Sequence, residues 1–514
     1  MPNPSSAAAR KKFLLATIDL GAHSCRMLLA ECDPKTQTPE ILEDLAVSVP
    51  LGSDVFRHGE ISGESIRMLC GIFTNFRQKM DEYGVRQYRA IATSAVREAS
   101  NAEILIERIR HATGIELKLF DGTDEARLNY LTVMHVLPRN FAFYKKSTLI
   151  ADIGTGACQI SAYVGGSFCF TETIKLGTLR VLDQMPGAMS AEGIRNFLTP
   201  IINKTFQELN QNTPVVKSRY IIAMGSSVRT LLSLFGVAGE GEAIWKISRT
   251  VFERQLAEIG SMSLDNLSDR YGVPQDQAET VIPCSLIVEN LFRISGATTL
   301  LVPVVSMKHE LLLDFMNETL KIEDGFSRQI EEMVRRTAEK YRSDADCIRR
   351  TALFADKLFI QLTGLHGCTV RDALLLRIAA LLHKTGLFIN NQSYHKHSCY
   401  IIRSTEIPGI SPAERNIAAL VARFHRKTPP EPGDPELAGL SPEQRSTVLK
   451  LSAILRLACG LADACRSVTQ FHLKAEKSRV VLEPSRELQM AVFSIPEQDV
   501  TFFNSVFAVE LSVK

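Results

Sequence analysis

The residues best suited to phosphate chemistry are two aspartates, each of which ends an apolar segment and precedes a glycine-containing turn. Asp19 lies in LLATIDLGAHSCRMLL and Asp152 in TLIADIGTGACQISAY, and the two segments align at an offset of 133 residues (19 to 152). A glycine turn lets backbone N–H groups point inward and hold a phosphate without a basic side chain. An aspartate beside it suits Mg²⁺, which binds one or two carboxylates together with phosphate oxygens and water. The pair therefore favours two turns facing one polyanion, whereas either motif alone also fits a tight hairpin whose aspartate caps the turn.

Two further polar segments are candidates for the same site. In RAIATSAVREASN a strand ends at Thr93, and Arg97 lies at a helix start, where backbone amides favour anions and arginine offers a forked phosphate partner. In LFDGTDEARLNYL a glycine turn precedes a helix whose first turn contains Asp124 and Glu125. Acidic residues there either balance the helix dipole or orient a water for in-line attack on phosphorus. The residues alone leave both interpretations open.

The elements that must position these residues change type along the chain. Up to about residue 315, strands alternate with helices. The expected elements are a strand–turn–strand unit at each aspartate, strands at 87–93 and 220–225, and helices over 64–83, 101–113 and 123–137. From about residue 325 long helical patterns dominate, with a proline-rich loop at 428–442, and after about residue 469 short alternating runs predict strands. The repeated strand–Asp–Gly unit predicts a duplicated α/β domain with a cleft between its halves.

Composition excludes several classes of protein. The 514 residues contain 59 Lys and Arg against 57 Asp and Glu, a formal charge of +2, so a generally basic nucleic-acid-binding protein is excluded and any anion site must be local. A hydrophobic share of 45% excludes a mostly disordered chain, and no apolar run reaches the length of a membrane span. The 11 cysteines form no CxxC pair, which favours reduced, mostly buried thiols in a cytoplasmic protein.

Taken together, the motifs resemble those of a known family. The matching segments are TIDLGAHSCRMLL, LGSDVFRHGEIS, ATSAVREASN, FDGTDEARLNYL, ADIGTGACQISAYVGG, IKLGTLRV and AMGSSVRTL. In order and spacing they resemble the exopolyphosphatase / guanosine pentaphosphate phosphohydrolase (Ppx/GppA) family of the actin–sugar kinase–heat-shock ATPase superfamily. The resemblance implies an α/β fold with a duplicated actin/ribonuclease-H-like two-lobed domain pair, an all-α degenerate HD-like domain and a small β-rich C-terminal region. The implied boundaries are a flexible tail at 1–11, lobe I at 12–145, lobe II at 146–320, the helical domain at 321–468 and the β-rich region at 469–514.

The same resemblance implies a reaction and the residues that perform it. Glu125 falls where the family places its water-activating glutamate, and Asp19 and Asp152 would bind Mg²⁺. The implied phosphate-binding residues are Gly21, Ser24, Arg97, Gly154, Thr155 and Gly156. The implied reaction is hydrolysis of a terminal phosphate of inorganic polyphosphate, or of the 5′ γ-phosphate of pppGpp to give ppGpp. The implied partners are these polyanions and a second copy in a homodimer, with no nucleic-acid polymer and no membrane.

Departures from the family pattern open a second interpretation. The second loop usually reads DIGGGSxE, whereas here Thr155 restricts a glycine position, Ala157 lacks a hydroxyl and Gln159 replaces a carboxylate. The alternative is therefore a catalytically weak regulatory protein that binds polyphosphate or a guanosine nucleotide. An ATP-using kinase of the same superfamily is a third interpretation, for which AMGSS makes a poor adenosine loop.

The helical half carries its own departures. His383 is followed by Lys384 where an HD-type metal site needs aspartate, and by resemblance Cys347 and Cys459 replace two further ligands. A working metal site is therefore not expected there. A basic cluster near helix ends could instead guide a polyanion toward the cleft, or simply be a solvated face. Its residues are His395, Lys396, His397, Arg423, His425, Arg426 and Lys427.

Overall fold

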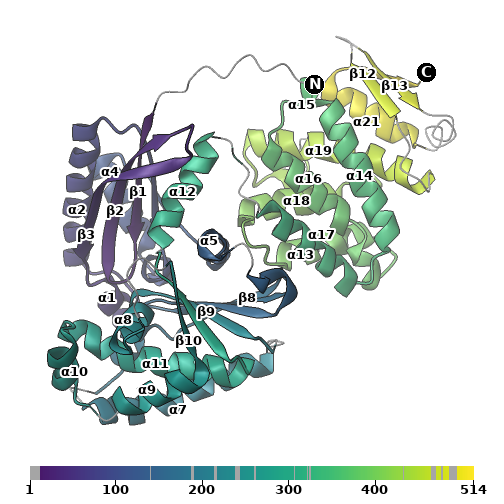
Figure 1. Ribbon diagram of the computed structural model, residues 1–514. Coiled ribbons are helices and arrows are strands. Elements are labelled where there is room, and N and C mark those ends of the chain that lie inside the picture. The colour runs from purple at the N-terminus through teal and green to yellow at the C-terminus, as the bar shows by residue number, and fades with distance from the viewer. Residues whose placement is uncertain are drawn as a thin grey trace. The chain divides into compact units, whose positions relative to one another are not determined.

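The chain folds into two compact units, Met1–Phe326 and Ser327–Lys514 (Figure 1). The computed structural model describes residues 12–513 apart from 139–140, 187–189, 213–216, 238–242, 260–261, 306, 321, 323–325, 432, 465–470, 476–478 and 485–494. The expected tail at 1–11 lies outside the described residues. Among those described, no helix is both long and apolar enough to cross a membrane.

The first unit begins with a five-stranded sheet. Its strands are β1 (Phe13–Leu20), β2 (Ser24–Asp33), β3 (Thr38–Ser48), β4 (Gln87–Ala92) and β5 (Leu117–Leu119), in the order β3-β2-β1-β4-β5. The expected hairpin is confirmed, since β1 runs antiparallel to β2 and its Asp19 lies opposite Arg26. β4 and β5 are parallel to β1, so β1 and β4 end at the same edge of the sheet. That edge carries Asp19 and the residues that follow Ala92.

Helices cover both faces of this sheet, as Figure 1 shows for α2 and α12. The helices that follow its strands are α1 (Leu51–His58), α2 (Gly63–Tyr83), α3 (Ser94–Glu98), α4 (Ala102–Thr113) and α5 (Gly122–Val136). Alternate residues of β1 point to opposite faces. Ala16 and Ile18 therefore pack with α2 and α4, whereas Leu15 packs with Leu312 and Met316 of α12 (Met307–Leu320).

A second sheet repeats the first. Its strands are β6 (Thr148–Ile153), β7 (Cys158–Val164), β8 (Ser167–Ile174), β9 (Tyr220–Met224), β10 (Ile244–Ser248) and β11 (Thr299–Pro303). The order β8-β7-β6-β9-β11 and the strand directions match those of β3-β2-β1-β4-β5, and β10 adds an antiparallel edge. This match confirms the duplicated α/β domain that the Asp–Gly repeat predicts.

The helices of the second lobe build one large apolar core against this sheet. They are α6 (Thr178–Leu182), α7 (Ala191–Asn212), α8 (Ser226–Leu234), α9 (Arg249–Ile259), α10 (Leu264–Tyr271) and α11 (Gln275–Ser295). Short 3₁₀ helix η1 (Ala142–Lys145) lies between α5 and β6. α12 follows β11 but packs on the sheet of the first lobe, so the chain crosses back after completing the second.

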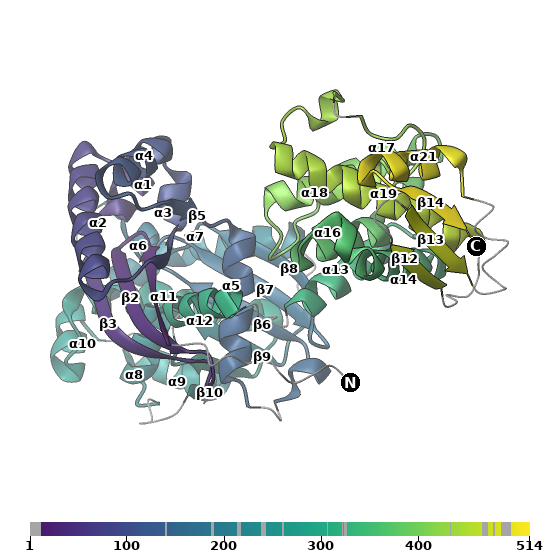
Figure 2. The ribbon, with the colours of Figure 1, turned by 90° about the horizontal axis from the view of Figure 1, so that it is seen from above.

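The second unit is mainly helical, as predicted, and ends in a small sheet (Figure 2). Its helices are α13 (Ser327–Lys340), α14 (Ala345–Gln361), α15 (Thr363–His366), α16 (Val370–Leu382), α17 (Tyr394–Ser404), α18 (Pro412–Arg423), α19 (Pro442–Ala464) and α21 (Glu497–Phe507), with 3₁₀ helices η2 (Thr385–Phe388) and η3 (Pro435–Leu437). Strands β12 (Phe471–Ala475), β13 (Arg479–Pro484) and β14 (Glu510–Val513) form one sheet. Of the strands expected after residue 469, the one in MAVFSI falls mostly outside the described residues.

The cysteines that the structure describes are all free, and seven of the ten are buried. Cys25 and Cys158 occupy equivalent positions just inside β2 and β7, where they pack in the cores of the two lobes. Burial raises the pKa of both thiols well above the ordinary value. The expectation of mostly buried thiols therefore holds for the described residues, and the raised pKa disfavours the nucleophilic thiolate form of Cys25 and Cys158.

Candidate functional site

The two predicted turns have the same geometry and face one space. The N–H of Gly21 donates to the Ser24 carbonyl at 2.9 Å, and the N–H of Gly154 donates to the Ala157 carbonyl at 3.0 Å. Both turns line a cavity of about 220 Å³ between the lobes of the first unit. The glycine N–H groups thus close the turns themselves. The N–H groups of Thr155 and Gly156 bond no acceptor within the described residues, so they are among the amides available to a phosphate.

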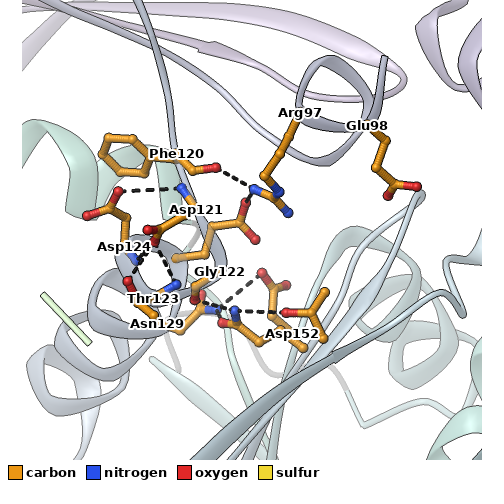
Figure 3. A network of polar contacts seen from close by, with 12 residues as sticks. Arg97, Glu98, Phe120, Asp121, Gly122, Thr123, Asp124, Asn129 and Asp152 are labelled. Atoms are coloured by element: carbon orange, nitrogen blue, oxygen red, sulfur yellow. Dashed lines mark hydrogen bonds and ion pairs between the residues drawn. The ribbon is translucent and has the colours of Figure 1, made fainter. Parts of the chain in front are cut away.

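The structure brings eight of the nine predicted site residues to this cavity. They are Asp19, Gly21, Ser24, Glu125, Asp152, Gly154, Thr155 and Gly156. The ninth, Arg97, instead donates to Glu125 and to the Phe120 carbonyl (Figure 3). Its contact with phosphate stays a prediction, whereas its contact with Glu125 is direct.

The start of α5 explains why Glu125, rather than its neighbour, faces the cavity. Asp121 caps the helix by accepting from the N–H groups of Thr123 at 2.8 Å and Asp124 at 2.9 Å. The Asp124 carboxylate reaches back to the Asp121 N–H at 3.4 Å, which completes a capping box (Figure 3). The cap occupies Asp124, so of the two acids in this turn only Glu125 lines the cavity.

Burial and one cation set the charge of Glu125. Its Oε1 accepts from Arg97 Nη1 at 2.8 Å. Burial, with smaller contributions from Asp152 and Asp19, raises the pKa of Glu125 to about 7 against the opposing effect of Arg97. A carboxyl group that changes protonation near neutral pH is suited to accept a proton from water there.

The two aspartates fit a magnesium site that is completed by phosphate. Burial raises the pKa of Asp19 to about 6, and burial also raises the pKa of Asp152, although Asn129 Nδ2 donates to Asp152 at 3.4 Å. Two half-buried carboxylates in one cavity are stabilised by a cation. The buried Asn129 Oδ1 has no hydrogen-bond partner within the described residues. No group of three or more His, Cys, Asp or Glu side chains in the same residues is arranged to hold a metal.

Three cations that the sequence did not single out also line the cavity. Arg26 lies opposite Asp19 in the β1–β2 register, Arg229 lies in the first turn of α8, and Lys308 lies at the start of α12. Burial lowers the pKa of Arg229, and the neighbouring Arg26 lowers it further. Lys308 binds Asp44 at 2.6 Å, whereas no ion pair involves Arg26 or Arg229 among the described residues. Arg26 interacts electrostatically with Asp19 and Arg229 with Asp152, but within the described chain neither is held in an ion pair, so both can contact an anion in the cavity.

The side chain of Gln159, the main departure from the family pattern, is held by hydrogen bonds to the residues around it. It lies opposite Asp152, the position in the repeat that corresponds to Arg26. The buried side chain donates from Nε2 to the Gly122 carbonyl at 2.6 Å, and its Oε1 accepts from Asn129 at 3.0 Å. A carboxylate has no hydrogen to donate to Gly122, so the glutamine holds the start of α5 in a way that glutamate would not.

An ion pair holds the second turn against the first lobe. Arg180 of α6 binds Glu98 of α3 through two bonds, at 2.6 and 3.1 Å, and its Nε donates to the Gly156 carbonyl at 2.5 Å. Its guanidinium lies 3.8 Å from the ring centroid of Phe56. A Cβ at Gly156 would lie 2.6 Å from Phe56 and 2.8 Å from Ser94, so only glycine permits this approach.

In the helical half, a lysine side chain lies where the resemblance would place the ligands of a metal ion. Lys384 Nζ donates to Asp463 at 3.0 Å and to the Cys347 sulfur at 3.0 Å, which places an ammonium among the positions where the resemblance would place metal ligands. The prediction that the basic cluster lies on the surface is wrong for two of its residues, because His395 and His425 are buried within this unit. Its remaining members stay a prediction.

Comparison with known proteins assigns the family. The family model described as Ppx/GppA phosphatase family matches residues 31–318, more than half of the chain. The chain belongs to this family. The Ppx/GppA phosphatase domain III model matches residues 330–492, within the helical unit, although the HD-like character of that unit stays a prediction. The resemblance inferred from the motifs is therefore confirmed.

Individual relatives of this Ppx/GppA member are distant but cover much of it. A guanosine-5′-triphosphate,3′-diphosphate pyrophosphatase of Aliivibrio fischeri is 22% identical over 457 residues, 86% of each chain. A solved exopolyphosphatase of Cytophaga hutchinsonii, 20% identical, superposes with a TM-score of 0.52 over 61% of this chain and 99% of its own. A family member of Aquifex aeolicus, 19% identical, gives 0.51 over 60% and 99%. These structures support the fold of the two lobes, which fits the actin-like architecture that the motifs implied.

Proposed function

We propose that this protein hydrolyses the terminal phosphoanhydride bond of inorganic polyphosphate or of the 5′-triphosphate of pppGpp. The observation that supports the proposal most directly is the position of Glu125, which faces the same cavity as both Asp–Gly turns. Arginine, lysine and carboxylate side chains all line that cavity, so one site contains groups suited to bind anionic phosphate and to activate water.

In this mechanism Arg97 orients the Glu125 carboxylate by donating to Oε1. The other carboxylate oxygen accepts the proton of the attacking water. The N–H groups of Thr155 and Gly156, with Arg26 and Arg229, bind the oxygens of the terminal phosphates. Asp19 and Asp152 would hold Mg²⁺. When bound, Mg²⁺ would neutralise charge that develops on the transferring phosphoryl group.

The proposal is tested by Glu125→Gln, which keeps the shape of the side chain but removes its basicity. We expect kcat for phosphate release, measured with Mg²⁺ on polyphosphate and on pppGpp, to fall at least ~100-fold. The matched control is Glu103→Gln on the exposed face of α4, which should leave kcat unchanged. An unchanged kcat in Glu125→Gln with a cooperative unfolding transition would refute the assignment.

A second candidate function is favoured by Gln159. The family pattern has a carboxylate there, and this chain has a neutral amide committed to the Gly122 carbonyl. The second candidate is therefore a protein that binds polyphosphate or a guanosine nucleotide without hydrolysing it. Tight binding of both ligands, with no phosphate released from either in Mg²⁺, would favour this candidate over the hydrolase.

A further inference from the structure

Asn129 of α5 is a buried amide that lines the cavity of the two Asp–Gly turns (the phosphate cavity). The residue is only 2% exposed, and its Oδ1 has no hydrogen-bond partner among the residues that the structure describes. A buried carbonyl oxygen without a donor is destabilising, so nearly all such groups in native proteins are satisfied by the protein, by ordered water or by a ligand. We therefore expect a molecule in the cavity to donate to Oδ1.

Hydrogen bonds to its neighbours fix which way the Asn129 amide points (Figure 3). Gln159 Nε2 donates to the Gly122 carbonyl at 2.6 Å, so Gln159 turns its Oε1 toward Asn129. Asn129 Nδ2 then donates to Gln159 Oε1 at 3.0 Å and to Asp152 Oδ2 at 3.4 Å. If the Asn129 amide were turned over, its oxygen would face these two acceptors and be repelled by both. The two amides together therefore hold Asn129 Oδ1 in place as an acceptor.

Asn129 lies one helical turn after Glu125, on the same face of α5. Residues four apart in a helix are neighbours, with Cβ atoms about 5–6 Å apart, and both of these side chains line the phosphate cavity. Arg97 donates to Glu125 Oε1, so the other carboxylate oxygen is the one left to accept from water. That oxygen and Asn129 Oδ1 are two acceptors that a single water molecule between them can bridge.

We propose that Asn129 Oδ1 and Glu125 together bind the attacking water, each accepting from one of its two O–H groups. The inference rests on the proposed function and adds a second water-binding residue to it. In-line attack needs a lone pair of the water directed at phosphorus, and a water whose two O–H groups are both bound presents its lone pairs to the phosphate. As the water oxygen bonds to phosphorus, the anhydride P–O bond breaks and its electron pair leaves with the shortened phosphate. One proton passes to Glu125, and the other stays on the released phosphate.

This role also relates Gln159 to hydrolysis. A glutamate at position 159 could accept from Asn129, but it could not donate to the Gly122 carbonyl. The glutamine does both, and so it orients the amide of Asn129 relative to the start of the helix that carries Glu125. The departure from the family carboxylate is therefore compatible with an active hydrolase.

The experiment compares water with methanol as the nucleophile. Methanol has a single O–H group, so it cannot satisfy both acceptors, whereas a general structural defect slows transfer to both nucleophiles alike. Asn129→Leu removes the acceptor at similar size. Asn129→Ala, which suits a helix and leaves room for water around Gln159, serves as the second variant if the first does not unfold cooperatively. The matched control is Thr132→Val, since Thr132 is buried in the same helix, bonds the Leu128 carbonyl at 2.8 Å and is not among the residues that line the cavity.

Phosphoryl transfer from polyphosphate and from pppGpp is followed by phosphorus NMR with Mg²⁺ at a fixed methanol concentration. We expect both Asn129 variants to lower kcat at least ~10-fold while KM stays within about twofold, because the water is misplaced and the phosphate contacts are kept. The ratio of methyl phosphate to inorganic phosphate should rise at least ~5-fold in both variants, since water loses its advantage over methanol. Thr132→Val should change neither kcat nor this ratio.

The inference is overturned if the Asn129 variants behave like Thr132→Val, or if their kcat falls while the product ratio stays that of the unmodified protein. In either case a large loss of kcat in Glu125→Gln would leave the hydrolase proposal standing. If the unmodified protein releases no phosphate from either substrate, the proposed function fails and this inference fails with it.

Discussion

The ion pair between Glu98 and Arg180 should determine how firmly the second phosphate turn is held. The Arg180 side chain is only 9% exposed and that of Glu98 28%, so the pair is neither a surface pair nor a fully buried one. Glu98→Gln keeps the size of the side chain and leaves the guanidinium without its carboxylate. Removing one partner of a fully buried pair costs about 3–5 kcal/mol, whereas surface pairs contribute about 0–1 kcal/mol. We therefore expect the free energy of unfolding of the first unit to fall by ~2 kcal/mol.

The same substitution should slow turnover, because Arg180 also fixes the Gly156 carbonyl and so the amides of the turn. A small displacement of phosphate-positioning groups lowers kcat by about tenfold. The assays are urea unfolding followed by the fluorescence of Trp245, the single tryptophan, which lies in β10 of the second lobe, and phosphate release under saturating substrate. Burial opposes ionisation of Glu98, but Arg180 and Lys175 outweigh it and hold the pKa of Glu98 below the ordinary value. The stabilisation is therefore present above the unfolded pKa and is lost as pH falls through the folded one, so the variant and the unmodified protein should converge in acid.

Lys175→Gln is the matched control for this prediction. Lys175 also lies near Glu98, at 3.5 Å, but its side chain is 75% exposed and water screens the interaction. We expect this control to leave both the urea midpoint and kcat close to those of the unmodified protein. If Glu98→Gln behaves like Lys175→Gln in both assays, the reasoning that the pair positions the turn is wrong.

Three further predictions follow from groups with displaced pKa values or committed hydrogen bonds. Because Glu125 must be deprotonated to accept a proton and its pKa is about 7, kcat should rise with pH through neutrality and then level off, and the residual rate of Glu125→Gln should not follow that profile. Burial lowers the pKa of His383 and His395 to about 4 and that of His425 well below its ordinary value. The unfolded chain therefore binds more protons below pH ~6.5, and the second unit should lose stability from there down to about pH 4 in pH-dependent unfolding. Gln159→Glu removes the hydrogen bond to the Gly122 carbonyl and buries a charge. It should therefore lower the free energy of unfolding of the first unit by ~2 kcal/mol, measured by urea unfolding, and should not raise kcat. A higher kcat in this variant would show that the glutamine limits activity.

The features predicted from the sequence are those that repeat or have strong local patterns. The offset between Asp19 and Asp152 predicted the duplication, and the structure repeats it down to the hydrogen bond that closes each turn. Buried strands such as β1 and β6 were readable because nearly all their residues are apolar. β3 was not predicted, because in TPEILEDLAVS most residues are exposed and charged or polar residues interrupt the apolar ones.

The features that were missed depend on contacts between distant residues. Arg26 and Arg229 lie within two of the matching motif segments but were not singled out in them, and only the folded chain shows that both line the phosphate cavity. Arg97 was predicted as a phosphate ligand because of its place at a helix start, but pairing with Glu125 requires α3 and α5 to converge. α12 follows lobe II in the sequence, yet its apolar residues match the open face of the first sheet. No local pattern reports such long-range complementarity.

The return of α12 to the first sheet has a consequence for biosynthesis. In the described part of the chain, one face of β1 and β2 packs against Leu312, Met316 and their neighbours, which leave the ribosome some three hundred residues after the strands themselves. During translation that apolar face stays exposed while the whole of the second lobe is made. The nascent first lobe therefore presents an exposed apolar patch, which favours association with other chains, for much of its synthesis. The opening strands thus reach their mature packing only after the second lobe has been made, and truncation before α12 would leave their apolar face permanently exposed and prone to aggregation.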